Sequence, residues 1–386
     1  MSEPLEADRL ADAPHPRETD RVIGHGAALK EIATAIGGEA LHHGWLFTGP
    51  RGVGKATVAW AMAHTLLARP LPSAGNGLFG TEAHPDVPND LFLDPDHPIA
   101  RRVLALSEPR LSLLRRPWDE KAGRLKADIP VDAARSLKRF LGMSAADGGY
   151  RVVIVDAADD MNPSAANAIL KLLEEPPAAT VFILISHRPG GLLPTIRSRC
   201  RVMRFAPLPA ANLDAALRQT GAETPIDTLD QARLARLAGG SVGAAVGILS
   251  MDGLELYRTL VTTIGALPRH DRPTVLAMAE KLAARDAEAK RRLAVDLTSS
   301  ILHTLAMGGA TGQWPDDLSD AERQMLGRLS PSPTAARAWG EAQSRISQRF
   351  GHGSAVSLDP VSLILDMVAT LDATASELSL TTGASP

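Results

Sequence analysis

The chain has 386 residues, enough for two or three domains with a sizeable core. Charged residues make up 22% and the net charge is −3, which argues against a surface built for non-specific DNA binding. Aromatic residues make up 4%, too few for an extended base-stacking platform. A single cysteine excludes an internal disulfide framework and any multi-cysteine zinc or iron–sulfur site. We therefore expect a globular protein of the reducing cytoplasm.

The amino-terminal part begins without a structural signal. Residues 1–20 are polar and acidic with little periodicity, which predicts a flexible tail and not a signal peptide. No apolar run approaches the roughly 20 residues of a membrane helix, so no membrane contact is expected. Helical spacing then extends from Ala27 to Ile36, and a short apolar strand follows at 45–47. A glycine-rich turn separates this strand from a predicted helix over 57–67.

Residues 70–128 form the least regular stretch and are rich in proline and turn residues. Within it, residues 100–126 carry eight basic residues against three acidic ones. Two interpretations stay open for this stretch. It is either a solvated surface insert or a contact for nucleic acid or an acidic partner.

Strands and helices alternate in the next part of the chain. Helices are predicted over 131–141 and 167–175, with strands over 150–155 and 181–185. Both strands are apolar on both faces, as parallel strands between two helical layers are. The alternation therefore predicts a parallel α/β sheet.

The carboxyl-terminal third is predicted to be all helix. Strand signals fade after Pro207, and leucine or isoleucine recurs at four-residue steps from Leu293 to Leu305. The last helix is predicted to begin at Pro360, with Asp359 as its cap.

The glycine-rich segment at 49–57 resembles a phosphate-binding loop. Glycines let the backbone curl so that successive N–H groups point at a phosphate, and the next helix adds its positive dipole end. The lysine of this pattern reaches the β- and γ-phosphates. The predicted nucleotide-binding residues are Gly49, Gly52, Gly54, Lys55 and Thr57.

Two positions depart from an active nucleotide hydrolase. Ala56 stands where Ser or Thr ligates Mg²⁺, and a methyl group cannot do so. Asp156 ends the strand at 150–155, where such proteins hold the metal, but Ala157 follows in place of a glutamate base. ATP hydrolysis by this chain alone is therefore not expected, and Asp159 and Asp160 are interpreted as ordinary loop or cap residues.

Four segments together resemble the AAA+ family, and within it the bacterial clamp-loader subunits. They are Val22-Ile23-Gly24-His25, the strand and loop at 42–50, the helix at 165–177, and the Ser-Arg-Cys motif at 198–200. The first segment lies near the adenine in this family, which adds Val22 and Ile23 to the expected nucleotide-binding residues. The resemblance covers residues 22–205 and implies an AAA+ P-loop domain, a small helical lid and an all-α collar.

Within this family the chain is similar to the delta-prime type of DNA polymerase III. The gamma/tau type has a complete P-loop, an Asp-Glu pair, four zinc-binding cysteines and a lid arginine, where this chain has Gly243. The zinc module is also missing here, and the basic insert at 70–128 stands in its place. The resemblance implies no zinc and no essential cofactor, with weak ATP or ADP binding left open.

The resemblance implies a role between subunits. In this family five subunits form an open ring, and an arginine from one subunit completes the ATP site of the next. Arg199 of the Ser-Arg-Cys motif is the implied arginine finger, with Arg197 and Arg201 as weaker candidates. Ser186 ends the strand at 181–185 at the family's phosphate-sensing position and is interpreted mainly as structural. The implied partners are the gamma/tau and delta subunits, the sliding clamp and, through the complex, primer-template DNA.

Three functions from different classes are weighed. The favoured one is a non-hydrolysing clamp-loader subunit, and the alternatives are an active ATPase of the gamma/tau type and a small-molecule kinase. The predicted domains are a flexible tail (1–20), a P-loop domain (21–206), a lid (207–251), a collar (252–372) and a disordered tail (373–386).

Overall fold

The computed structural model describes residues 6–10, 13–38, 41–70, 91, 93–142, 148–222, 224, 227–284, 287–356 and 358–382. Two compact units divide the chain. The first comprises residues 1–222 with 239–244, and the second comprises residues 223–238 with 245–386.

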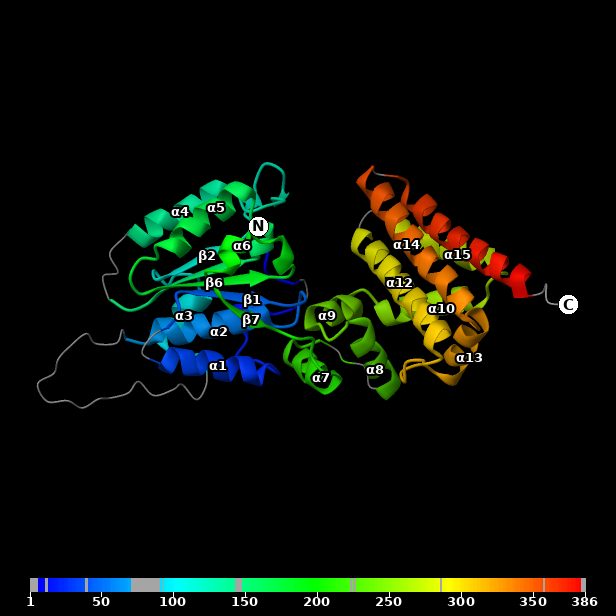
Figure 1. The fold of residues 1–386 in the computed structure, drawn as a ribbon, viewed down its shortest axis with the longest axis horizontal. Helices are drawn as coiled ribbons and strands as arrows, with labels where there is room; N and C mark the ends of the chain where they lie inside the picture. The colour runs from blue at the N-terminus through cyan, green and yellow to red at the C-terminus, as the bar shows by residue number, and fades with distance from the viewer. Residues whose placement is uncertain are drawn as a thin grey trace, which may run out of the picture. The chain divides into compact units, whose positions relative to one another are not determined.

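The first unit is built on a parallel sheet of five strands in the order β2-β5-β6-β1-β7 (Figure 1). The strands are β1 (Gly44–Thr48), β2 (Leu111–Leu114), β5 (Arg151–Asp156), β6 (Thr180–Ser186) and β7 (Arg201–Arg204). Every ladder in this sheet is parallel. The predicted parallel α/β fold is thereby confirmed.

Helices cover both faces of the sheet. They are α1 (Gly26–Gly37), α2 (Lys55–Ala68), α3 (Pro98–Leu104), α4 (Val131–Gly142), α5 (Pro163–Glu174) and α6 (Pro194–Arg197), and α7 (Ala210–Gln219) follows beyond the sheet. Successive strand residues enter different cores: Val152 and Ile154 pack with α1 and α2, while Val153 and Val155 pack with α4 and α5. This alternation follows from the two-residue period of a strand and explains why the strands are apolar throughout.

The sequence located three of the five strands. The predicted strands at 45–47, 150–155 and 181–185 correspond to β1, β5 and β6. It missed β2 and β7, which are the two edges of the sheet. Both are only four residues long, and β7 exposes three of its four residues, so neither has the continuous apolar run of a buried strand.

The segment 70–128 is more regular than its composition predicts. Residues 71–90 and 92 lie outside the described residues, but the remainder holds α3, β2 and a small antiparallel hairpin. The hairpin strands are β3 (Trp118–Asp119) and β4 (Arg124–Leu125). Five of its eight basic residues are in ion pairs within the chain: Arg101, Arg102, Arg110, Arg115 and Arg116. These arginines are largely engaged in holding the fold together, which weakens the nucleic-acid interpretation.

Residues 1–20 also differ from the predicted loose tail. The described part carries the short 3-10 helix η1 (Pro16–Glu18), and His15 has no exposed surface. The His15 ring packs edge-on against Trp60 of α2, with 5.7 Å between ring centroids. Contacts between segments far apart in sequence give no local periodicity, so the pattern could not reveal them.

The described part of the second unit is helical. It contains α8 (Thr228–Leu237), α10 (Gly253–Gly265), α11 (Arg272–Ala283), α12 (Glu288–Thr311), α13 (Asp320–Leu329), α14 (Pro333–Ala355) and α15 (Pro360–Thr382), and α9 (Val242–Ser250) begins in the first unit. Leu297, Ile301 and Leu305 of α12 are buried as their spacing predicts. Asp359 caps α15 by accepting a hydrogen bond from the Ser362 amide at 2.9 Å.

The helix α15 continues beyond residue 372, where the collar was predicted to end. Thr374 and Ala375 are buried, so residues 373–382 are helical and not the predicted disordered tail. None of the described helices is by itself long and apolar enough to cross a membrane, and α8 with α9 meets that test only as a bent pair, by length and composition.

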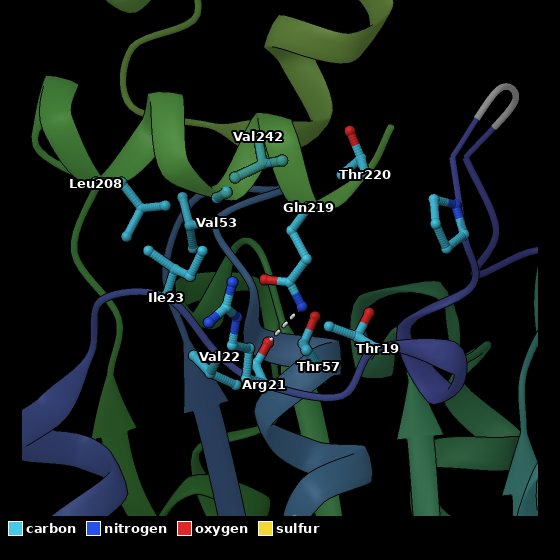
Figure 2. A pocket seen from close by; sticks show the side chains of 12 residues that line it. Thr19, Arg21, Val22, Ile23, Val53, Thr57, Leu208, Gln219, Thr220 and Val242 are labelled. Carbon is cyan, nitrogen blue, oxygen red and sulfur yellow. Dashed lines mark hydrogen bonds between the residues drawn. The ribbon is translucent and has the colours of Figure 1, made fainter. Parts of the chain in front are cut away.

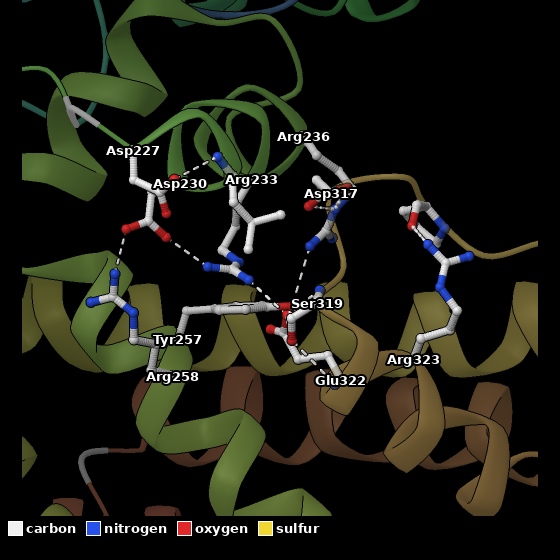
Figure 3. A network of polar contacts seen from close by, with 12 residues as sticks. Asp227, Asp230, Arg233, Arg236, Tyr257, Arg258, Asp317, Ser319, Glu322 and Arg323 are labelled. Carbon is white, nitrogen blue, oxygen red and sulfur yellow. Dashed lines mark hydrogen bonds and ion pairs between the residues drawn. The ribbon is translucent and has the colours of Figure 1, made fainter.

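A buried polar network joins α8 to two other helices of the second unit (Figure 3). The guanidinium of Arg233 donates to Asp230 at 2.6 Å and to Glu322 of α13 at 2.7 Å. It also lies over the Tyr257 ring of α10, 5.3 Å from the centroid. Arg258 of α10 forms a second ion pair with Asp230. Since the Arg233 side chain is only 5% exposed, its charge depends on these partners.

Candidate functional site

The P-loop joins β1 to α2 at the carboxyl edge of the sheet, and donors of this chain hold its carbonyl groups. Lys55 Nζ donates hydrogen bonds to the carbonyl oxygens of the first two of the five residues at 49–53, Gly49 and Pro50. Ser241 Oγ donates to the carbonyl oxygen of the third, Arg51, at 2.8 Å. The Gly243 amide donates to the fourth at 3.2 Å. His25 Nε2 lies 2.7 Å from the fifth and must be the donor, because a carbonyl oxygen carries no proton. The loop is therefore fixed from three different segments.

Lys55 is turned into its own loop. Its Nζ lies 2.7 Å from the Gly49 carbonyl oxygen, and the residue is 2% exposed. Burial lowers the pKa of Lys55 to about 8, although the nearby Asp156 and Asp159 favour its charged form. A phosphate at this loop would have to draw the ammonium group away from the two carbonyls.

Two positions of the loop require glycine, because other parts of the chain come too close for a side chain there. Gly49 has φ +147°, and a Cβ there would lie 2.2 Å from the Phe205 carbonyl oxygen. Gly52 has φ +76°, and a Cβ there would lie 2.4 Å from Ser241 Oγ. Both combine a left-handed backbone with contacts that leave no room for a side chain. Gly49 therefore lets the residue after β7 approach the loop, and Gly52 lets the lid turn at 240–243 pack on it.

A pocket in the first unit collects part of the predicted nucleotide site (Figure 2). Val22, Ile23 and Thr57 line it, whereas Lys55 is not among its lining residues. Its other walls include Val53, Leu208, Gln219, Thr220 and Val242. Gln219 Nε2 donates to the Arg21 carbonyl oxygen at 3.0 Å and so ties α7 to the wall. An apolar pocket beside a phosphate loop has the composition of a base-binding pocket.

Asp159, in the short helix that follows β5, holds the loop after β6. Asp159 Oδ1 accepts hydrogen bonds from Ser186 Oγ at 2.8 Å and from the Arg188 amide at 3.2 Å, and its Oδ2 accepts from the His187 amide. It therefore caps the loop after β6, in line with the interpretation of Asp159 as a cap. Ser186 has no exposed surface and is committed to this contact.

A metal-bound nucleotide does not fit the residues present. Ala56 is partly buried and packs its methyl group against the core between the sheet and α2. Burial, followed by the charge of Asp8, raises the pKa of Asp156 to about 7. Ala157 is buried and offers no base. Among the described residues no cluster of His, Cys, Asp or Glu could hold a metal ion.

Arg199 lies at the amino-terminal ends of the strands, whereas the P-loop lies at their carboxyl-terminal ends. It precedes β7, and Trp45 of β1 pairs with Arg201, so Arg199 stands where β1 begins. A Cβ on Gly44 would lie 3.0 Å from the Arg199 carbonyl oxygen, which places both at the amino edge. The P-loop follows the other end of β1, and the five residues of that strand span roughly 15 Å.

The Arg199 side chain is partly exposed and lightly held. Its Nη2 lies 2.9 Å from Glu174 Oε1 at the end of α5, and its Nη1 donates to the Thr195 carbonyl oxygen at 3.0 Å. The side chain is 36% exposed and that of Glu174 is 42% exposed. An ion pair of this exposure contributes about 1 kcal/mol or less, so a stronger anion can displace Glu174.

The neighbours of Arg199 have structural roles. Arg201 forms an exposed ion pair with Glu31 at 2.7 Å and, unlike Arg199, also lies over an aromatic ring, 5.1 Å from the Trp45 centroid. Burial raises the pKa of Cys200 to about 12, which keeps its thiol neutral in the core. Cys200 is a small, buried side chain beside Arg199.

Several contributors were not among the predicted site residues. His25 and Ser241 hold P-loop carbonyls, while Leu208 and Gln219 line the pocket. His25 stands in the segment Val22-Ile23-Gly24-His25, which was the available signal for it. Leu208 and Gln219 stand in no such motif, since their position depends on how α7 folds back.

Comparison with known proteins matches nearly the same residues as the resemblance seen in the sequence, which covers 22–205. A family model described as "DNA polymerase III, delta subunit" matches residues 24–209. A DNA polymerase III subunit delta' from Pseudomonas aeruginosa is 37% identical over 217 residues, which are 53% of this chain and 56% of the relative. Residues 24–209 thus resemble the delta-prime family of DNA polymerase III subunits. The sequence resemblance is thereby confirmed.

Other relatives match different shares of this chain. The Escherichia coli subunit delta' is 37% identical over 39% of this chain and 45% of its own length. The subunit gamma/tau of Mycobacterium tuberculosis is 26% identical over 81% of this chain and 55% of its own length. This chain thus spans about half the length of the curated relatives that it matches. A solved gamma-subunit-related protein from Thermotoga maritima has a TM-score of 0.43 at 17% identity, covering 90% of this chain and 99% of that one.

Replacing Asp156 with asparagine is expected to stabilise this P-loop domain above pH 7 by about 1–3 kcal/mol. The pKa of Asp156 in the folded chain, about 7, lies above its unfolded value near 4. Between these values the folded chain holds a proton that the unfolded chain has released, so stability falls as pH rises and stays lower above pH 7. Asparagine removes this dependence.

Urea denaturation at pH 5 and pH 8 measures this effect. Asp96→Asn is the control, because the Asp96 side chain is 86% exposed. An equal change of stability between the two pH values in wild type and Asp156→Asn would contradict the assignment.

Proposed function

We propose that this chain is a non-hydrolysing subunit of a replicative clamp-loader complex that supplies Arg199 in trans to the ATP site of a neighbouring subunit. The observation that carries this proposal is the position of Arg199. It stands at the amino edge of the sheet, whereas the chain's own P-loop stands at the carboxyl edge. A guanidinium reaches about 7 Å from its Cα at most, which is less than the length of β1. Its phosphate must therefore belong to another molecule.

The chemistry of Arg199 suits that task. Negative charge builds on the phosphoryl oxygens during transfer, and a guanidinium neutralises two of them at once. The Glu174 ion pair engages one nitrogen of the guanidinium, Nη2, at 2.9 Å. A γ-phosphate carries more charge than a carboxylate, so it can take Arg199 from Glu174 when subunits assemble.

The chain's own site supports the non-hydrolysing half of the proposal. Lys55 and the loop glycines are retained, but Ala56 and Ala157 remove the metal ligand and the base. Asp159, the next carboxylate along the chain, is already bound to Ser186 and the loop after β6. The proposal includes no essential cofactor and no zinc, with weak binding of ATP or ADP as the most that this loop offers.

The partners follow from the family resemblance and are part of the proposal. They are subunits of the gamma/tau and delta types, the sliding clamp and, through the complex, primer-template DNA. The second unit would act as the collar that fixes neighbours in the ring. The basic residues at 100–126 are not needed for DNA contact in this proposal, because most are paired within the chain.

The purified chain is expected to show no ATP turnover above background, and Lys55→Ala is expected to leave that background unchanged. Added to subunits of the gamma/tau and delta types with clamp and primed DNA, the chain is expected to raise the ATP hydrolysis rate of the mixture by about tenfold or more. Steady-state phosphate release measures both.

Two results would count against the proposal. Turnover by the chain alone that is lost in Lys55→Ala would favour the alternative, an active ATPase of the gamma/tau type. No change of rate on addition to the partner subunits, despite co-elution with them, would remove the arginine-finger role.

A further inference from the structure

The described residues 6–10 and 13–20, here called the N-terminal strap, lie against the P-loop and its pocket. A Cβ atom on Gly243 would lie 3.0 Å from Leu10 Cδ1 and 3.2 Å from Gly52 Cα. Leu10 therefore lies close to both the lid turn and the P-loop. Thr19 lines the pocket opposite the wall formed by α7 (Figure 2). The strap therefore contacts both the phosphate end and the base end of the candidate nucleotide site.

Asp8 anchors the strap at the carboxyl edge of the sheet. Its side chain has no exposed surface and forms an ion pair with Arg115, the residue directly after β2. Leu114 pairs with Val155 in the neighbouring strand, so Arg115 stands opposite Asp156. The Asp8 carboxylate is thereby held beside the position where this fold expects the metal and the γ-phosphate.

The second partner of Asp8 is His15. The Nδ1 of His15 accepts a hydrogen bond from the Arg17 amide at 3.1 Å, so the proton of the neutral ring is on Nε2. That nitrogen lies 3.1 Å from Asp8 Oδ2. Burial opposes the charge of Asp8, but His15 and Arg115 outweigh it and lower the pKa of this carboxyl. Asp8 is therefore a buried, ionised group with dedicated partners.

Further contacts hold the strap in one conformation. Glu6 pairs with Arg115 at 2.8 Å and with Arg17 at 2.9 Å. The Glu18 side chain accepts from the His15 amide at 3.0 Å and closes a capping box around η1. The His15 ring packs on Trp60 of α2, the helix that follows the P-loop. A loose tail would not bury the Asp8 carboxylate and the His15 imidazole, because unpaired burial of such groups is costly.

We propose that the N-terminal strap is an intramolecular competitor of nucleoside di- and triphosphates at this chain's own P-loop. Nucleotide phosphates would bring negative charge to an edge that already holds the carboxyls of Asp8 and Asp156, with no metal ligand at Ala56 to balance it. Nucleotide therefore binds only in the fraction of molecules whose strap has left, and the apparent affinity falls by that fraction. This inference goes beyond the proposed function and does not depend on Arg199.

Titration of the full chain with a fluorescent ADP analogue tests the competition. Asp8→Ala is expected to bind it about 10-fold to 100-fold more tightly than wild type. Arg115→Ala, which removes the other half of the anchor, is expected to act in the same direction. Asp96→Ala is the control, because it removes an exposed carboxylate of the same unit. Adding Lys55→Ala to Asp8→Ala should abolish the gain if the ligand occupies the P-loop.

Limited trypsin digestion reports the strap itself. Arg17, whose side chain is 11% exposed, is a protected cleavage site, and cleavage after it should accelerate in Asp8→Ala and in wild type with excess ADP. Faster cleavage in Asp8→Ala without tighter binding overturns the proposal. Unchanged cleavage and unchanged binding in both Asp8→Ala and Arg115→Ala overturn it as well, as does binding that survives Lys55→Ala.

Discussion

Replacing Arg199 with alanine is expected to lower ATP hydrolysis at the neighbouring site of the proposed complex by a factor of about 10³, without preventing assembly. Under that proposal the substitution removes a guanidinium that neutralises charge in the transition state and leaves the P-loop of the neighbour intact. Hydrolysis by the whole complex should fall less if its other ATP sites do not depend on Arg199. DNA-stimulated phosphate release by the reconstituted complex measures the rate, and gel filtration measures assembly.

Two further variants make the Arg199 test specific. Arg199→Lys keeps the charge but loses the planar pair of donors, so only part of the rate should return. Arg197→Ala is the matched control, because Arg197 is an exposed arginine two residues away at the end of α6. A rate loss in Arg197→Ala equal to that in Arg199→Ala would mean that the motif contributes general positive charge and not a finger.

Replacing Arg233 with alanine is expected to destabilise the second unit by about 3–5 kcal/mol. The substitution leaves Asp230 and Glu322 as buried carboxylates that have lost their shared cation, and it exposes the face of the Tyr257 ring. Removing one partner of a buried ion pair costs more than the pair contributes, because the other charge stays desolvated. Hydrogen exchange of amide protons in α8 and α10 measures the local loss of stability.

Arg349 provides the matched control for Arg233. It forms an ion pair of 2.6 Å with Asp366 in the same unit, but its side chain is 62% exposed. Arg349→Ala should therefore change stability by less than about 1 kcal/mol. If the two alanine variants were equally stable, the buried network around Arg233 would have no special role in holding α8 to α10 and α13.

The sequence allowed the central strands and the P-loop to be predicted because their signals are local. The runs at 152–155 and 181–185 are apolar at every position, which only a strand covered on both faces explains. The loop is recognised by glycines at fixed spacing between a strand and a helix. Ala56 and Ala157 could be identified as departures for the same reason: each position is defined by its distance along the chain from a recognisable residue.

The edge strands and the N-terminal strap could not be predicted in this way. β2 and β7 are short and half-exposed, so the two-residue pattern has too few positions to stand out. The strap has no period at all, since Asp8 is ordered by Arg115 and His15 by Trp60, at separations that no window of sequence contains. Polar residues that are buried through distant partners look like solvated ones in a sequence.

By itself, the sequence indicated the family and the fold class, and it singled out Ala56, Ala157 and Arg199 as the positions to test. The tertiary structure decided where these groups stand relative to one another. It places Arg199 and Lys55 at opposite ends of β1, and it brings Asp8 to the strand ends beside Asp156. The reason is physical: residue types and local spacing specify chemistry and secondary structure, whereas the edge of the sheet that a group occupies depends on strand order and register.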